Sequence, residues 1–391
     1  MVPRAIGRRR TGAAPSRVNR SDASSRRPVA GEEEQSSMAL LETNLRPDLG
    51  SDHRGPVLPT PRGPLSRWLL DTLTRPLGAA QAQAPRPAPP VDPSIDPLTD
   101  DDFHLALHVV YELSYRGFAD VDDAWEWDPI VIAFRRDLER RFEHRLREAI
   151  ATRRLIEGAP TVGAVIDRFA GPSLSTHMAE RGTVEQFREF AIHRSAYQLK
   201  EADPHSWGFP RLSGERKAAF VEIQADEYGN GRAGEAHADL FGRALDDLGL
   251  DSTYGRYLDR LPGVTLATGN LISMLGMQRR LRAALLGHLA GFEMTSVRPM
   301  SRYAAAARRL HLGPPVERFY DVHVEADEHH GHLAATTLVG GDPAADGLDP
   351  AEICFGAAAM LLVEDGFARH LLHAWAHGRS SLRPDPESAR P

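Results

Sequence analysis

The sequence predicts an all-α protein with a single helical domain at residues 98–378. Two observations support this prediction. No segment alternates apolar and polar residues with a period of two for long, whereas from residue 98 onward apolar residues recur at spacings of three and four. Glycine, proline and capping residues separate these periodic segments, as expected of helices joined by short turns. The remaining segments, residues 1–97 and 379–391, are expected to be disordered.

The first 97 residues form a leader and linker rich in Pro, Arg, Ser, Gly and Ala, with few apolar runs. Such a segment buries too little apolar surface to offset the entropy of ordering. Residues 65–73 could form one short amphipathic helix, and we prefer a fragment packed on the domain, or disorder, over a docking segment. Residues 84–97 are Pro-rich and predict an extended linker. Met38 is an alternative start, which would leave residues 1–37 untranslated.

The helices of the domain are predicted from their periodicity and from the residues that start and stop them. The segment Leu98-Thr-Asp-Asp101 is expected to supply one N-cap and Ser213 another. Pro204 and the segment Gly229-Asn-Gly231 are expected breaks, and Pro299 should bend or stop the chain. The expected helices cover residues 103–113, 130–151, 161–170, 183–202, 213–228, 235–249, 265–295, 300–310, 316–330 and 350–377.

Composition excludes several classes of protein. The formal net charge of −7 disfavours non-specific nucleic-acid binding. Cys354 is the single cysteine, so a disulfide framework and cysteine-ligated metal sites are excluded, and any metal must be held by His, Asp and Glu. No apolar run is long enough to span a bilayer, and no apolar segment follows Arg8-Arg9-Arg10 as a secretory signal would require. We therefore expect a cytoplasmic protein without a membrane partner.

The strongest chemical motif is the stripe His323, Asp327 and His330. On a helix, spacings of four and three place these side chains on one face. Two imidazoles and a carboxylate suit iron or zinc. The competing interpretation is a solvated face, because Glu325 and Glu328 lie alongside.

Three further carboxylates and one histidine are candidates for the same site. Glu227 closes a predicted helix and His237 follows the glycine break, so both can point inward. Glu293 is the only acid between Leu261 and Val316, and a buried carboxylate needs a cationic partner. Glu201 beside Lys200 at a helix end is by itself typical of a solvated residue.

A second histidine cluster, His370, His373 and His377, also shares one helical face. It has no carboxylate in its own stripe. A cationic cap at the end of the last helix is therefore the favoured interpretation.

One set of residues resembles the pattern of the haem-oxygenase-like diiron oxidases and oxygenases, an iron-containing redox enzyme family. The set consists of Glu201, Glu227-Tyr-Gly-Asn-Gly-Arg, His237, Phe-Glu293 and His323-x-x-x-Asp327-x-x-His330. The resemblance covers roughly residues 98–378. It implies a haem-oxygenase-like bundle of about seven core helices that holds two non-haem irons in place of haem. It assigns the last ligand position to His330 and not to His329.

The resemblance also implies a ligand set and a reaction. The metal ligands would be Glu201, Glu227, His237, Glu293, His323, Asp327 and His330. Members of the family that oxygenate an amine nitrogen carry an extra carboxylate, and Glu201 stands where it is expected. The best-known such enzymes are fused to a cupin or act on arginine derivatives, and we find no β-rich cupin segment, so the substrate of this chain is open.

We therefore expect an O2-dependent oxygenase that acts on a small amine or amino acid, takes electrons from an external reductant, and forms a possible homodimer. Its catalytic residues would be Glu227, Glu293, His323 and Asp327, with Glu227 or Glu293 bridging the irons. Tyr197, Arg232 and Tyr320 lie beside ligand positions and are candidates for substrate contact.

Three alternatives remain from the sequence alone. The same diiron site could carry out oxidative decarboxylation or C–C cleavage. The chain could be a metal-free helical scaffold or binding protein. A haem enzyme of the parent fold would need an early histidine, and His104 and His108 are available for that role.

Overall fold

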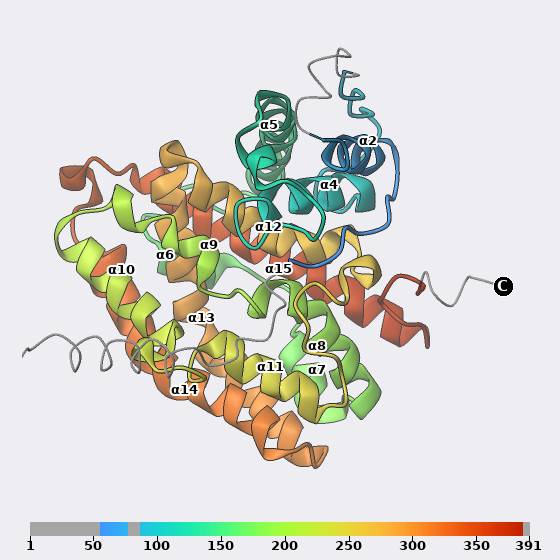
Figure 1. The fold of residues 1–391 in the computed structure, drawn as a ribbon. Helices are drawn as coiled ribbons and strands as arrows, with labels where there is room; N and C mark the ends of the chain where they lie inside the picture. The colour runs from blue at the N-terminus through green and yellow to red at the C-terminus, as the bar shows by residue number, and fades with distance from the viewer. Residues whose placement is uncertain (1–54, 77–86, 386–391) are drawn as a thin grey trace, which may run out of the picture. The chain divides into compact units, whose positions relative to one another are not determined.

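The computed structural model describes residues 55–76 and 87–385, and the described residues are helical with no β-strand among them (Figure 1). The predicted all-α class is confirmed. The predictions for residues 1–54, 77–86 and 386–391 lie outside the described residues.

Local sequence signals start several of the helices where they were predicted. Carboxylate or hydroxyl caps accept the first free amide groups, which a helix leaves unbonded at its start. These caps are Asp100 for α4 (Asp101–Glu112), Asp128 for α5 (Pro129–Thr152), Ser173 for α7 (Leu174–Arg181), Thr183 for α8 (Val184–Gln198) and Asp349 for α15 (Pro350–Ala376). Helix α7 was not predicted from the sequence.

The predicted helix at 265–295 is wrong in its extent. The chain forms α12 (Gly263–Met277), leaves the helical conformation at Gln278, and resumes as α13 (Arg282–Arg309). The guanidinium of Arg211 donates to the carbonyls of Gly276 and Met277 and so satisfies the end of α12. This cap comes from a distant segment. Pro299 lies inside α13 and does not stop it, so no separate helix begins at residue 300.

The N-terminal boundary of the folded part also differs from the prediction. Residues 64–73 form α2 (Pro64–Leu73), which buries Leu65, Leu69 and Leu73 against the domain. The carboxylate of Asp102 accepts from the amides of Leu65 and Ser66 at 2.8 and 2.9 Å. This segment packs on α4, which is one of the alternatives that the sequence left open for it.

The C-terminal segment after residue 378 makes specific contacts as far as Arg383. The Ser381 hydroxyl lies 2.9 Å from His193 Nε2, and the Arg383 guanidinium pairs with Asp101. The predicted disorder from residue 379 therefore does not describe residues 379–385.

Helix α13 is the centre of the packing. It packs most extensively against α15 and α14 (Pro314–Leu333), while α12 packs on α4 and α15 (Figure 1). The other helices are α6 (Val162–Arg168), α9 (Asp203–Ser206), α10 (Gly214–Glu227) and α11 (His237–Asp247). Helices α10, α11, α13 and α14 carry six of the seven predicted ligand residues, and Glu201 lies in the turn after α8.

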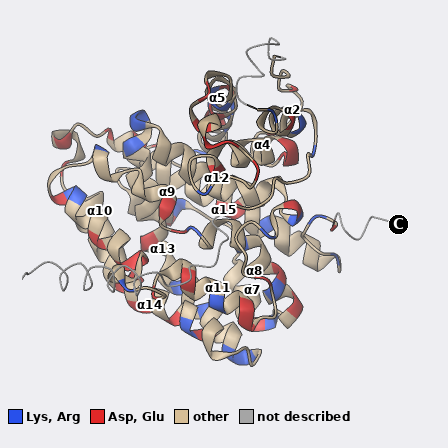
Figure 2. Cartoon of the chain, in the orientation of Figure 1, with Lys and Arg blue, Asp and Glu red and all other residues tan. Residues whose placement is uncertain are grey.

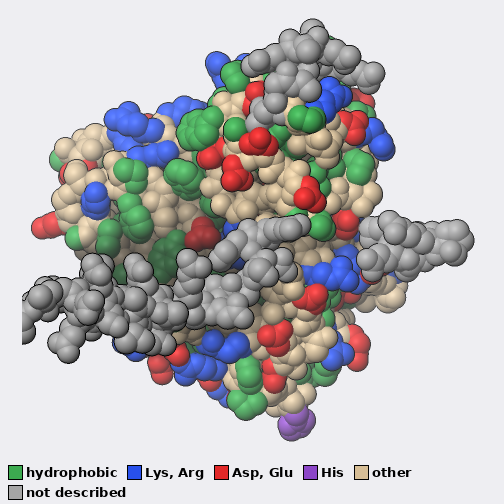
Figure 3. Space-filling model, viewed as in Figure 1, with side chains coloured by type: hydrophobic (Ala, Val, Ile, Leu, Met, Phe, Trp, Pro, Cys, Tyr) green, Lys and Arg blue, Asp and Glu red, His purple; other side chains and the backbone are tan. Residues whose placement is uncertain are grey.

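The surface carries charges of both signs. Lys and Arg residues are interspersed with Asp and Glu residues along the helices (Figure 2). Figure 3 shows an acidic side chain recessed near the position of α9, with hydrophobic side chains beside it. None of the described helices has both the length and the apolar character needed to cross a membrane.

Candidate metal centre

The structure brings all seven predicted ligand residues into one region. Glu201 lies in the turn after α8, Glu227 ends α10, His237 begins α11, Glu293 lies in α13, and His323, Asp327 and His330 lie on α14. Glu201 keeps 12% of its side chain exposed, and the other six residues are buried.

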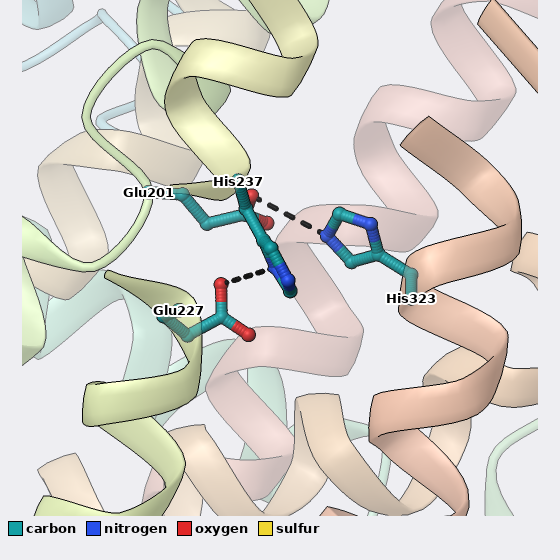
Figure 4. Close-up of side chains that lie close together, drawn as sticks. All are labelled: Glu201, Glu227, His237 and His323. Atoms are coloured by element: carbon teal, nitrogen blue, oxygen red, sulfur yellow. Dashed lines mark ion pairs between the residues drawn. The ribbon is translucent and has the colours of Figure 1, made fainter. Parts of the chain in front are cut away.

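Four of these side chains form a first group: Glu201, Glu227, His237 and His323. Their ligand atoms all lie within 4.8 Å of one another. His237 Nδ1 lies 2.8 Å from Glu227 Oε2, and His323 Nε2 lies 3.5 Å from Glu201 Oε2. Figure 4 shows the four side chains converging from separate segments.

A second group consists of Glu227, Asp327 and His330, with ligand atoms again within 4.8 Å of one another. Glu293 adjoins this group, because its Oε2 lies 3.5 Å from His330 Nδ1. Asp327 Oδ1 lies 3.8 Å from the same nitrogen. Glu227 belongs to both groups, so the two candidate sites share one carboxylate.

Five buried ligand atoms in these groups make their close contacts with other members of the centre, and no hydrogen-bond partner outside the centre is found for them among the described residues; His237 Nδ1 and Glu227 Oε2, for example, lie 2.8 Å apart. They are Glu201 Oε2, Glu227 Oε2, His237 Nδ1, His323 Nε2 and His330 Nδ1. Buried polar atoms are almost always hydrogen-bonded, and leaving one unsatisfied costs about 1–3 kcal/mol. Five such atoms facing one another are what a bound cation would satisfy, so the donor set fits a metal.

The outward nitrogens of two histidines have partners that orient the rings. His323 Nδ1–H donates to the Phe319 carbonyl at 2.7 Å, which leaves Nε2 free to act as a ligand. His330 Nε2 lies 3.3 Å from Asp226 Oδ2 while Nδ1 faces the group. Such partners fix the tautomer of a metal-binding histidine. Sequence reasoning did not identify Asp226, since an acid beside Glu227 points to another face of the helix.

A close approach in the backbone brings Glu227 and His237 together. Gly229 has φ +65°, and a Cβ there would lie 2.5 Å from the carbonyl carbon of Glu235 and 2.6 Å from the amide nitrogen of Ala236. Glycine is therefore needed both for its conformation and for the contact. The predicted break at Gly229-Asn-Gly231 corresponds to this turn.

A similar close approach joins α13 and α14. A Cβ on Gly331 would lie 2.9 Å from the carbonyl oxygen of Glu293. The absence of a side chain at Gly331 lets the two helices approach, which places His330 beside Glu293.

Three carboxylates of the centre have pKa values far from those of free side chains. Although burial opposes ionisation, the charge of His237 lowers the pKa of Glu227 to about 2. Burial, together with the charges of Asp327 and Glu227, raises the pKa of Glu293 to about 8. Burial also raises the pKa of Asp327 to about 6.

The pKa values of two histidines of the centre, His323 and His330, are raised as well. Burial disfavours their charged forms, but contact with Glu201 raises the pKa of His323 to about 10. Contact with Glu293 likewise raises the pKa of His330 to about 9, against the effect of burial. Without a metal, protons therefore supply the positive charge that the carboxylates require.

A cavity of about 380 Å³ borders the centre. Glu201, Glu227, Glu293, His323 and Asp327 form part of its wall, and so do the substrate candidates Tyr197 and Tyr320. The third candidate, Arg232, is exposed and does not line this cavity. Space for a small molecule thus lies directly against the ligand residues.

The rival histidines do not form a comparable centre. His370 Nε2–H donates to the Ser381 carbonyl at 2.8 Å, and His377 Nδ1–H donates to the His373 carbonyl at 2.7 Å. His104 and His108 are buried in α4 and do not line the cavity beside the carboxylates. Neither the histidines of α15 nor those of α4 therefore contribute to the candidate metal centre.

Comparison with known proteins gives two matches. Residues 188–365 match the model of a family described as iron-containing redox enzymes. A nitrosourea synthase from Streptomyces achromogenes subsp. streptozoticus is 28% identical over 142 residues, which is 36% of this chain and 30% of that enzyme. The chain therefore covers less than a third of that relative, and the family match contains all seven predicted ligand positions.

Proposed function

We propose that this chain, whose residues 188–365 match the iron-containing redox enzyme family, is a non-haem diiron oxygenase that uses O2 to oxidise a nitrogen atom of a small amine or amino-acid-derived substrate. The helical fold and an iron-dependent oxidoreductase activity agree with this family match. The two-iron stoichiometry, the use of O2 and the N-oxygenation are the parts that we propose.

The observation that carries the proposal is the set of five buried ligand atoms around Glu227 whose close contacts are with one another or with Glu293. We propose that Glu201, Glu227, His237 and His323 hold one iron, and that Glu227, Glu293, Asp327 and His330 hold the other. Glu227 would contribute to holding both ions because it belongs to both groups. The negative charges of the four carboxylates would be balanced by two Fe(II) ions if all three imidazoles are neutral.

When bound, the irons would supply the open coordination positions and the electrons that O2 activation needs, and an external reductant would replace those electrons. The chain's own residues contribute position and environment. The Phe319 carbonyl fixes the orientation of the His323 ring, and the Asp226 carboxylate fixes that of the His330 ring. The buried wall around Glu227, Glu293, His323 and Asp327 limits the access of bulk water to the reacting atoms.

Two observations favour nitrogen oxidation over other outcomes. The similar Streptomyces protein is by name a nitrosourea synthase, so its product carries an oxidised nitrogen. Glu201, the extra carboxylate expected of N-oxygenating members, faces His323 in the first group and is not a solvated residue. Its side chain is available to the same ion as His237.

The proposed substrate is a small molecule that enters the cavity of about 380 Å³ beside these ligands. A nucleic-acid partner and a membrane partner form no part of the proposal. The cytoplasmic location and the homodimer predicted from the sequence stay predictions.

The test is iron-dependent O2 consumption after anaerobic loading with Fe(II). The His323→Ala variant should lose this activity. His329→Ala is the matched control, because His329 is 61% exposed and pairs with Glu222 outside the centre. Equal O2 consumption by both variants would contradict the proposal. Mass spectrometry of the product separates a gain of oxygen from the loss of carbon expected of decarboxylation or C–C cleavage.

A further inference from the structure

Lys200, the residue before the candidate ligand Glu201, is buried. Its side chain is 3% exposed, although a Lys–Glu pair at a helix end is typical of solvated residues. The ammonium group lies 2.6 Å from Glu112 Oε2 at the end of α4, and 4.3 Å from the ring centre of Tyr115. Two adjacent residues therefore point to opposite sides of the chain: Lys200 points toward α4, and Glu201 points toward His323 on α14.

Glu201 differs from the other six candidate ligands because it does not lie on a helix. Helix α8 ends at Gln198, and Glu201 lies in the turn that follows. Hydrogen bonds within this turn include Lys200 N–H to the Tyr197 carbonyl and Asp203 N–H to the Lys200 carbonyl, each 3.0 Å. A functional side chain must be held to within about 0.5 Å of its productive position. Contacts from outside the turn can supply that precision.

A second contact from the end of α4 holds the same turn. The guanidinium of Arg116 donates to the Leu199 carbonyl at 3.0 Å. Leu199 is the C-cap of α8, where a carbonyl has no partner within the helix. The guanidinium also lies 4.1 Å from the ring centre of Tyr254, whose hydroxyl donates to Glu112 Oε2 at 2.8 Å. Tyr254 thus joins the two anchors, which hold the two successive residues before Glu201.

The buried ion pair is better explained by positioning than by stability. Removing two charges from water costs about as much as their attraction returns, so a buried pair is often no more stabilising than apolar residues of the same volume. The Glu112 carboxylate, however, is fully engaged, because it accepts from Lys200, from the Tyr254 hydroxyl and from the Arg116 amide at 3.3 Å. A satisfied polar network of this kind specifies one arrangement of the chain.

We propose that Glu112 and Arg116 are positioning residues for the candidate metal centre. They anchor the turn after α8 to α4 and so keep the Glu201 carboxylate directed at His323. Neither residue lines the cavity, and both precede residues 188–365, which match the family model. That Glu201 binds iron once it is placed there rests on the proposed function, whereas the anchoring of the turn does not.

Two variants remove the anchors and spare the fold. The double variant Glu112→Gln/Lys200→Met removes both charges together, so no buried charge is left unpaired, and the new amide oxygen can still accept from Tyr254. Arg116→Gln removes the guanidinium from the Leu199 carbonyl, and Arg116 is an exposed residue.

Each variant has a control of the same kind. Tyr111→Phe removes a buried hydrogen bond of α4, in which the Tyr111 hydroxyl donates to Glu139 at 3.0 Å. Arg140→Gln removes a guanidinium that is 66% exposed and pairs with Asp137 at 2.7 Å. Both partners lie on α5, so neither control removes an anchor of the turn.

Two measurements are made on the full chain. Hydrogen exchange of the metal-free chain, followed by mass spectrometry, reports how firmly residues 199–203 are held. Titration with isotopically enriched Fe(II) without O2, followed by Mössbauer spectroscopy, reports the two irons separately. The Glu201→Ala variant identifies the signal of the iron that Glu201 binds.

Exchange in residues 199–203 should be roughly tenfold faster in both variants and unchanged in both controls, because each variant loses a hydrogen bond that involves a charged group. The affinity for the iron that Glu201→Ala weakens should fall on the order of tenfold, and its signal should change, while the other iron is retained. A variant that only destabilised the fold would affect both irons alike, so this difference separates positioning from stability.

The proposal is overturned if the double variant and Arg116→Gln exchange as the wild type does, if they keep the wild-type signals of both irons, or if they lose both irons equally. Arg116→Gln changes an exposed residue and stays informative if the double variant fails to fold. A wild-type chain that binds no iron would contradict the proposed function. The exchange measurement alone would then decide whether Glu112 and Arg116 anchor the turn.

Discussion

The contact between Gly229 and the backbone before His237 sets how closely α10 and α11 approach, and a Gly229→Ala substitution tests this contact. The added methyl group would meet the Glu235 carbonyl carbon at 2.5 Å and the Ala236 amide nitrogen at 2.6 Å. Both neighbours are backbone atoms, so they cannot turn aside as a flexible side chain would. The expected response is a separation of Glu227 from His237.

Gly231 provides a matched control within the same turn. Its φ of +74° is similar to the +65° of Gly229, but a Cβ there would meet nothing within 4 Å. Both substitutions impose the left-handed conformation on alanine, at a cost of about 1–2 kcal/mol, and both restrict the unfolded chain alike. Gly229→Ala alone adds an overpacking cost of about 1–3 kcal/mol.

The assay compares the free energy of unfolding by urea, without metal, and the iron bound after anaerobic loading. Gly231→Ala should lose about 1–2 kcal/mol and keep its iron. Gly229→Ala should lose about 2–5 kcal/mol in total and bind less iron, because Glu227 and His237 no longer converge. Equal stability and equal iron content in the two variants would refute this account of the turn.

Two further predictions concern buried charge. Lys200→Met should reduce the free energy of unfolding by about 3 kcal/mol, because it leaves Glu112 buried without the ammonium group that lies 2.6 Å away. Lys217→Met should have little effect in the same urea titration. Iron binding should release protons at pH 7, and the affinity for iron should increase as pH rises. The reason is that the metal must displace protons from His323, with a pKa of about 10, and from His330, with a pKa of about 9. Identical calorimetric binding enthalpies in two buffers of different ionisation enthalpy would contradict this prediction.

Local patterns were enough for the α14 stripe and for most helix bounds. The spacing of His323, Asp327 and His330 fixes their common face through helix geometry alone, and α14 spans Pro314–Leu333 where residues 316–330 were predicted. The caps at Asp100 and Thr183 act within one turn of the helices that they start, so the sequence around them carries the necessary information.

Features that depend on distant contacts were not predicted. The break between α12 and α13 is stabilised by Arg211, which lies far away in the sequence. The segment of α2 is flanked by Pro-rich sequence, and only its packing against α4 distinguishes it from the rest of the leader.

The site shows the same division. Glu201 would count as solvated from its neighbours in the sequence, and only the family resemblance identified it as a candidate ligand. Asp226 gave no signal, because its contact with His330 depends on how α10 and α14 come together. Glu227 and His237 were found because a glycine break between two polar residues is visible in the sequence.

We propose that seven side chains from five segments of the chain hold two irons around Glu227. The most direct measurement is an anaerobic titration of the metal-free chain with Fe(II), in which the bound iron per chain is determined for the wild type and for Glu227→Ala. We expect about two irons for the wild type and a marked loss from both sites in Glu227→Ala, since that carboxylate belongs to both groups. A wild-type chain that binds no iron, or a Glu227→Ala variant that binds as much as the wild type, would contradict it.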